Sequence, residues 1–277
     1  MGLFSLSGGH LSKTITAIIG DTHIGSTTAL SPERFTIHGR DTREAQIVSA
    51  NLLGKWLLDN WNEYWHYVYG LVGKKNRLIV VHLGDVIDGN HHGSPQLIQE
   101  VGDQAQIAVD MLKPIAKRAD AFFGILGTGV HAGQVGANEV EIYKAIGAAE
   151  YGQQLTIEID GSVHDFAHHG RAGRRPWTSA AANLGTEVMI DYAVSGMRPP
   201  DYIWRGHNHI IDDSGSKLPG TRVICTPSWQ LKTEYGWKVS ANTVRSDIGG
   251  FIMDGDRLDD SRARYRAQPD GRRIIKA

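Results

Sequence analysis

Cysteine is nearly absent from this sequence, because Cys225 is the only one among 277 residues. A single cysteine excludes a disulfide within the chain. It also argues against a structural zinc site, since such sites favour closed sets of mostly cysteine ligands. Cys225 lies in the apolar run from Thr221 to Thr226, so we expect its thiol to be buried and unreactive.

Long hydrophobic runs are absent too, since no stretch of 18 apolar residues occurs. The first residues, Met1 to Ser12, lack the basic start and long apolar centre of a secretion signal. We therefore expect a cytoplasmic protein with no membrane partner. The net charge of −1 excludes a global attraction to nucleic acid, so any polyanion must bind a local patch.

The sequence has enough apolar residues for one large α/β domain, with 41% hydrophobic and 21% charged residues. No linker rich in proline or serine and no shift in composition divides the chain. We expect a single domain over residues 1–277, with a core that carries the motifs at 14–210 and late strands at 211–277.

Apolar runs and helix breakers predict alternating strands and helices. Strands are expected at 14–20, 77–83, 121–126, 163–167 and 201–205. Helices are expected at 41–69, 95–118, 136–149 and from 176 to about 194. Short late strands are expected at 223–225, 250–253 and 264–276. This order is typical of a sandwich with mixed sheets.

The predicted helix at 41–69 carries five aromatic residues, Trp56, Trp61, Tyr64, Trp65 and Tyr67. They could form a platform for nucleobases, but their helical spacing favours packing in a core or an interface. This helix and the late hairpins could also support a dimer. The oligomeric state stays open.

Carboxylates and imidazoles follow four of the predicted strands. They form four groups: Asp21 with His23, Asp85 with Asp88, His168 with His169, and His207 with His209. Ligand sites of open α/β sheets lie at the carboxyl ends of the strands. Nitrogen and oxygen donors without thiolates suit Mn, Fe, Zn or Co better than Ca. The sequence therefore predicts a catalytic metal site at this edge.

The order of these motifs is D-x-H, G-D-x-x-D, a glycine-flanked His, H-G and G-H-x-H. In this order they resemble the signature of the calcineurin-like metallophosphoesterase superfamily, from Asp21 to His209. The resemblance implies a four-layer α/β/β/α sandwich with two mixed sheets, and a site at one edge of the sheets.

The resemblance also implies two divalent transition-metal ions, Mn, Fe, Zn or Co, with Asp85 as the bridging ligand. The first metal would be held, besides Asp85, by Asp21, His23 and His209. The second would be held, besides Asp85, by His207 and by one of the consecutive residues His168 and His169. Because neighbouring residues at a strand end point to opposite sides, the sequence leaves that choice open.

Two further residues have implied catalytic roles. Asp88 would orient a histidine, and by resemblance its partner is His131, which would protonate the departing alkoxide. The alternative for Asp88 is an ordinary turn or capping residue. A metal-bound hydroxide would attack phosphorus.

One motif departs from the family. The family usually has G-N-H-D or G-N-H-E, whereas residues 127–132 read Gly-Thr-Gly-Val-His-Ala, so the Asn ligand is missing. Val130 cannot coordinate a metal. Thr128, a backbone carbonyl, Asn138 or a water could take the place of the missing oxygen.

Substrate contacts are predicted in two loops. Arg171, Arg174 and Arg175 follow the predicted ligand His169 and could grip phosphate, although a solvated basic loop is equally compatible. Asn90 and His91 could contact substrate phosphate, or could lie in an exposed polar loop.

This local positive charge favours a phosphodiester of a nucleotide or nucleic acid as the substrate, as in nucleases and phosphodiesterases. A phosphomonoesterase is one alternative, although the arginine that phosphoprotein phosphatases usually carry after G-D-x-x-D is absent. A degenerate binding module that keeps the fold without catalysis is the other alternative.

Overall fold

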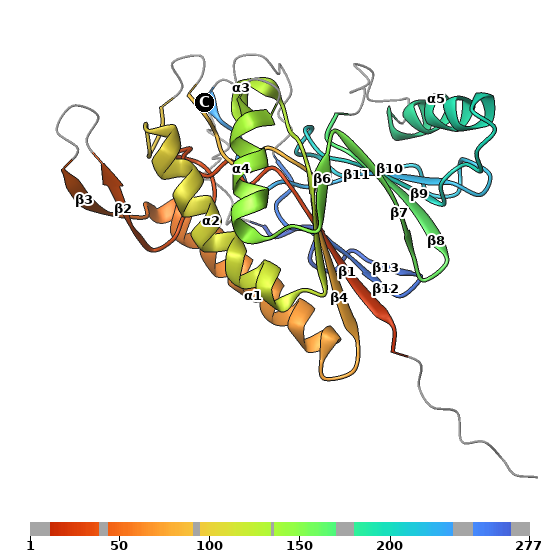
Figure 1. Cartoon of the computed structure of the whole chain (residues 1–277), viewed down its shortest axis with the longest axis horizontal. Coiled ribbons are helices and arrows are strands. Elements are labelled where there is room, and N and C mark those ends of the chain that lie inside the picture. Colours follow the sequence, from red (N-terminus) through yellow and green to blue (C-terminus); the bar gives the residue numbers. More distant parts are fainter. Residues whose placement is uncertain are drawn as a thin grey trace, which may run out of the picture.

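The computed structural model describes residues 12–38, 44–90, 95–133, 136–169, 180–234 and 246–266. Most of its strands form two mixed sheets that pack face to face, and helices cover the outer face of each sheet (Figure 1). The four-layer α/β/β/α sandwich expected from the sequence is therefore confirmed.

The first sheet has six strands in the order β13-β12-β1-β4-β5-β6. Four of them run parallel to one another, and β12 and β13 are antiparallel additions at the β1 side. The bounds are β1 Thr14–Ile19, β4 Arg77–His82, β5 Ala121–Ile125, β6 Glu150–Gly152, β12 Phe251–Asp254 and β13 Arg257–Asp259.

The second sheet has five strands in the order β10-β11-β9-β8-β7. Its three middle strands are parallel and its two edge strands pair antiparallel. The bounds are β7 Gln154–Ile159, β8 Ser162–Ala167, β9 Tyr202–Arg205, β10 Asp212–Asp213 and β11 Arg222–Cys225.

Strand β1 is buried on both faces, as its continuous apolar sequence predicts. Ile15, Ala17 and Ile19 pack with the helices, whereas Ile18 points the other way into the layer between the two sheets. In that layer Ile18 shares a cluster with Trp204 of β9. The two sheets are thus joined by a closed apolar core directly beneath the edge where the polar motifs lie.

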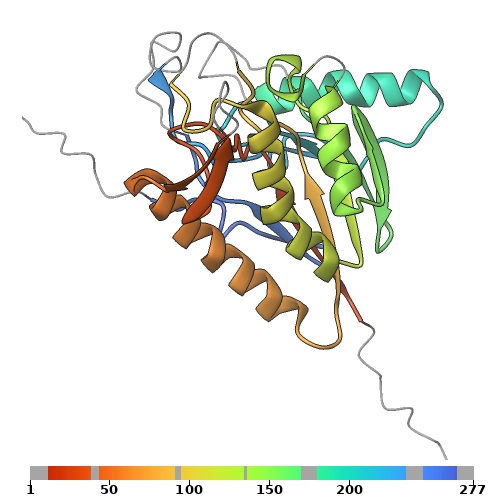
Figure 2. The ribbon, with the colours of Figure 1, turned by 60° about the vertical axis from the view of Figure 1, so that its left-hand side comes forward.

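Three long helices, α1, α2 and α4, lie side by side over the first sheet (Figure 2), and α5 packs on the second. The bounds of the helices are α1 Leu52–Val72, α2 Val101–Arg118, α3 Gly129–Ala132, α4 Ala137–Ile146 and α5 Ala180–Val194. Trp61, Tyr64 and Trp65 of α1 are at most 5% exposed and pack near Trp229, so core packing of the aromatic stripe is confirmed for these three residues.

The expected helix at 41–69 was wrong at its start. Residues 45–49 instead form β3 (Ala45–Ser49), which pairs with β2 (Arg34–His38) in a separate hairpin. Helix α1 begins only after Asn51, because the Asn51 side chain accepts a hydrogen bond from the Gly54 N–H at 2.7 Å and so caps the helix.

Smaller differences concern other boundaries. The helix expected from residue 95 begins at Val101, and strands β6 and β7 were not predicted. Most of the strand expected at 264–276 lies outside the described residues. Cys225 is 3% exposed, which confirms a buried thiol, and burial raises the pKa of this thiol to about 11. Across the described ranges, none of the helices has the length and apolar character needed to cross a bilayer.

Candidate metal centre

The register of the first sheet brings two motifs together. Strands β1 and β4 are parallel, with Ile19 opposite His82, so the residues after both strands emerge at one edge. Pairing continues into the loops, where the Asp21 N–H donates to the Gly84 carbonyl at 2.9 Å and the His23 N–H to the Asp85 carbonyl at 3.0 Å. The D-x-H and G-D-x-x-D motifs therefore lie side by side.

The second sheet delivers the other two motifs to the same place. Strands β8 and β9 are parallel and end together, just before His168 and His207. The His168 Nδ1–H donates to the Leu83 carbonyl at 2.6 Å, and the His207 backbone N–H donates to the Asp21 carboxylate at 3.1–3.2 Å. These bonds cross from one sheet to the other and fix the four loops relative to one another.

Three side chains form the first donor set, Asp21, His23 and His209. The Nε2 atoms of His23 and His209 are 3.2 Å apart, and Asp21 Oδ1 lies 3.2 Å from His209 Nε2 and 3.9 Å from His23 Nε2. Two imidazole nitrogens and a carboxylate oxygen at these separations match the donor spacing around one bound cation.

We define the second donor set as Asp85, His168 and His207. It overlaps two groups of possible metal ligands, one of His168, His169 and His207 and one of Asp21, Asp85 and His168. Asp85 Oδ2 is 3.0 Å from His168 Nε2, and His168 is 1% exposed. His169 is exposed, and its ring lies 4.8 Å from that of His207 at the rim of the site. Of the two consecutive histidines, His168 thus faces Asp85 and His169 borders the opening.

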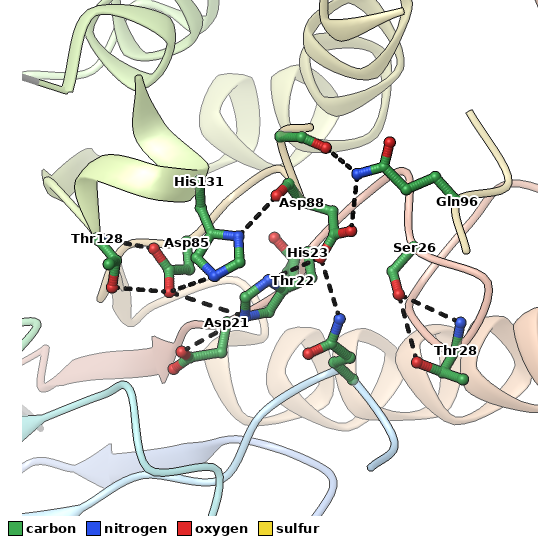
Figure 3. A network of polar contacts seen from close by, with 12 residues as sticks. Asp21, Thr22, His23, Ser26, Thr28, Asp85, Asp88, Gln96, Thr128 and His131 are labelled. Atoms are coloured by element: carbon green, nitrogen blue, oxygen red, sulfur yellow. Dashed lines mark hydrogen bonds and ion pairs between the residues drawn. The ribbon is translucent and has the colours of Figure 1, made fainter. Parts of the chain in front are cut away.

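One oxygen, Oδ2 of Asp85, lies between the two donor sets. It is 3.0 Å from His168 Nε2 and 3.8 Å from His23 Nε2. The other oxygen, Oδ1, accepts a hydrogen bond from the Thr128 backbone N–H at 2.6 Å, which fixes the orientation of the carboxylate (Figure 3). Asp85 is therefore placed to be shared between two cations.

Asp88 contacts two histidines in different ways. Its side-chain Oδ1 lies 3.4 Å from His23 Nδ1, which is within ion-pair distance. The two atoms do not form a hydrogen bond of good geometry. The expected partner, His131, donates from Nδ1 to the backbone carbonyl of Asp88 at 2.6 Å (Figure 3). Gln96 and Gln230 donate to the Asp88 carboxylate at 3.1 and 3.3 Å. The carboxylate thus faces a histidine of the first donor set.

The electrostatics of the metal-free site favour a cation. Burial opposes the protonation of His168, but hydrogen bonding and attraction from Asp85 raise its pKa to about 9. Desolvation and then His168 lower the pKa of His207 to about 4, so its imidazole is neutral. Without metal, a proton on His168 balances the Asp85 charge. A divalent ion that displaced the His168 proton would take over that charge balance, so the residues fit a divalent metal.

The backbone at this site is strained. Among the described residues, six that are not glycine have a positive φ, and five of them belong to the donor sets, Asp21, His23, Asp85, His207 and His209. Such conformations cost about 1–3 kcal/mol each and gather at functional sites. The tight loops hold each donor at the sheet edge at the expense of this local strain.

A buried glutamate, Glu139, binds the backbone of two loops of the metal centre. Glu139 of α4 accepts hydrogen bonds from the Val86 N–H at 2.8 Å and the Gly127 N–H at 2.6 Å. Burial, with the charge of Asp85 adding to it, raises the pKa of Glu139 to about 7. Glu139 was not among the residues predicted from the sequence, although its helical spacing to Ile142 and Tyr143 places an acid on the apolar face of a helix and is a recognisable signal.

Gly127 permits the close approach of two loops. A Cβ at this position would overlap the Asp85 carboxylate and backbone nitrogen. We therefore expect Gly127→Ala to displace Asp85 and to weaken metal binding by about 10- to 100-fold. Gly129→Ala in the same loop is the matched control, because a Cβ there meets nothing within 4 Å. Metal titration of both variants checks this, and equal affinities would contradict it.

The remaining residues singled out in the sequence are either exposed or outside the described residues. Asn90 is exposed in the loop after Asp88, and Val130 is 48% exposed. His91, Arg171, Arg174 and Arg175 lie outside the described residues.

Comparison with known proteins gives structural similarities only. No protein-family model matches the chain, and no curated protein matches it. Vacuolar protein sorting 29 from Cryptosporidium parvum is similar with 10% identity and a TM-score of 0.40, over 87% of this chain and 84% of that one. A novel archaeal phosphodiesterase is similar with 12% identity and a TM-score of 0.40, over 91% and 97%.

A hypothetical protein, PH1004 from Pyrococcus horikoshii, has 11% identity and a TM-score of 0.47, over 89% of this chain and 85% of that one. At these values the likenesses carry no information on function. The ordered motifs, the two mixed sheets and the donor sets at their shared edge are features of this chain itself. They agree with the layered fold and the metal site at one sheet edge that were expected from the sequence.

Proposed function

We propose that this chain is a metal-dependent phosphoesterase that hydrolyses a phosphodiester of a nucleotide or nucleic acid. The observation that supports this proposal most is the position of Asp85 Oδ2, which lies within 4.0 Å of donor nitrogens from both sides of the centre. A carboxylate oxygen shared in this way suits two cations.

Two bound divalent ions would neutralise the non-bridging phosphoryl oxygens and make hydroxide available at neutral pH. The chain supplies the rest. Asp21, Asp85 and the histidines of both donor sets would hold the ions. His131 would act as the general acid in its doubly protonated form, in which Nδ1–H donates to the Asp88 carbonyl and the second proton, on Nε2, would pass to the leaving oxygen.

The choice of a diester rests on the sequence around the site. Arg171, Arg174 and Arg175 follow His169 directly and would bring guanidinium groups to a phosphate. His169 and His207 are both exposed. The substrate would then approach from the rim formed by these two histidines.

A binding module without catalysis is the second candidate. It is favoured by one observation, the absence of the family Asn between Gly127 and His131. If no other group replaces that oxygen, the second cation would be weakly held and turnover would be lost.

Elemental analysis of protein purified without chelator separates the two candidates, when it is run beside hydrolysis of bis(p-nitrophenyl) phosphate and p-nitrophenyl phosphate. The proposed enzyme should hold about two metal ions per chain and should cleave the diester faster after addition of Mn²⁺. Treatment with a chelator should abolish cleavage, and Mn²⁺ should restore it. A chain that binds at most one ion and cleaves neither ester with any divalent metal would overturn the proposal.

A further inference from the structure

We infer that the hydroxyl of Thr128 is a ligand of the second metal ion and replaces the Asn that the chain lacks. This inference rests on the proposed binuclear centre. Thr128 follows β5, and its Oγ1 lies 3.3 Å from Asp85 Oδ2, 3.2 Å from His168 Nε2 and 3.3 Å from His207 Nδ1. A single oxygen is thus close to every member of the second donor set.

The spacing of these four atoms matches a coordination shell. Four ligand atoms about 2.0–2.1 Å from one ion lie about 3.3–3.4 Å apart when they form a tetrahedron. The separations around Thr128 Oγ1 are 3.2–3.3 Å, and Asp85 Oδ2 is 3.0 Å from His168 Nε2. These four of the six separations between the four atoms are close to the values of such a shell, so the hydroxyl is placed to complete the set of four donors.

The chemistry of the neighbouring atoms agrees. His168 uses its Nδ1–H for the Leu83 carbonyl, so its neutral form presents a lone pair at Nε2 toward Thr128. His207 turns its Nδ1 toward the same hydroxyl. Lone pairs of nitrogen and oxygen that converge at these distances are stabilised by a cation between them. Threonine hydroxyls bind divalent cations in other proteins, as in phosphate-binding loops.

Neither Val130, which stands in the motif directly before His131, nor the candidate side chain Asn138 takes this position. Val130 has no donor and is 48% exposed. The Asn138 amide lies against Gly133, where it would meet a Cβ on that glycine at 2.8 Å. Gly129 and Val130 stand between Thr128 and His131, so the spacing differs from that of the family motif G-N-H, in which the Asn directly precedes the His. Thr128 directly follows Gly127, as the Asn follows its glycine in the family motif.

Thr128→Val tests the ligand, because valine keeps the branched shape and the backbone N–H that binds Asp85 while the hydroxyl is removed. Equilibrium dialysis against Mn²⁺ should give a second ion bound at least about 10-fold more weakly, with the first ion unchanged. Electron paramagnetic resonance should show the loss of spin coupling between two Mn²⁺ ions. Thr128→Ser should bind both ions as the wild type does.

Thr128→Cys gives a positive signal that loss of folding cannot imitate. A thiolate at this position should produce a sulfur-to-metal charge-transfer band when Co²⁺ is added, whereas Val130→Cys should not. The wild-type protein with Co²⁺ controls for the buried Cys225.

The inference is overturned if Thr128→Val keeps two tightly bound ions, if it loses both ions together, or if Thr128→Cys gives no band. Failure of the proposed function gives a different result, since the wild-type chain itself would then bind fewer than two ions and cleave no ester.

Discussion

Replacing Asp85 by asparagine is expected to remove hydrolysis and to prevent the binding of two metal ions. The amide would keep the hydrogen bond from the Thr128 N–H, but it would lack the charge that both donor sets share and would turn an NH₂ group toward His168. Because metal ions supply several kcal/mol to the transition state and about 1.4 kcal/mol corresponds to a factor of ten, the rate should fall at least about 10³-fold. Initial rates and metal content measure both effects.

Asp160→Asn is a matched control for this variant. Asp160 is also an aspartate with positive φ, but it accepts hydrogen bonds from Thr14 at the opposite end of β1. This control should keep wild-type metal content and rate. If Asp85→Asn also held two ions, Asp85 would not be the shared ligand.

Replacing His131 by alanine should lower kcat by about 10²- to 10⁴-fold, the range for loss of a general acid, while both metal ions stay bound. The loss should be greater for a dinucleotide, whose alkoxide leaving group needs a proton, than for bis(p-nitrophenyl) phosphate, whose leaving group is a weak base. Comparison of kcat for the two substrates, with metal content measured in the same preparations, checks this.

His66→Ala is the corresponding control, since His66 is exposed on α1. A different role for His131 would have a clear signature. His131 shares a possible donor group with His23 and Asp85, so a variant that loses one metal ion would identify His131 as a ligand instead. Equal losses with both leaving groups would likewise count against proton donation.

The placement of the site could be predicted from the sequence because it depends on strand ends. Polar residues after buried parallel strands collect at one edge, and this rule brought Asp21, Asp85, His168 and His207 together. The layers of the sandwich followed from the same alternation of apolar strands and helices. Both rest on long periodic segments, which sequence patterns report well.

Other features depend on contacts that a linear pattern does not contain. Residues 45–49 have helix-forming residues such as Ala45 and Gln46, but pairing with β2 makes them a strand. The Asp88 carboxylate faces His23 rather than His131, and this choice depends on side-chain directions that the sequence does not contain. The position of Thr128 could not be chosen over other oxygens, because the insertion before His131 hides the spacing of the motif.

The order of strands in the first sheet determines when the metal site can form during folding. Strand β1, which leads to Asp21, lies between β4 and β12, and β12 comes from residues 251–254. During synthesis β1 therefore lacks one neighbour until the late part of the chain has been made, and pairing of such distant segments is slow. Since each donor set also needs loops of both sheets, metal uptake should follow the docking of the sheets and mark the end of folding.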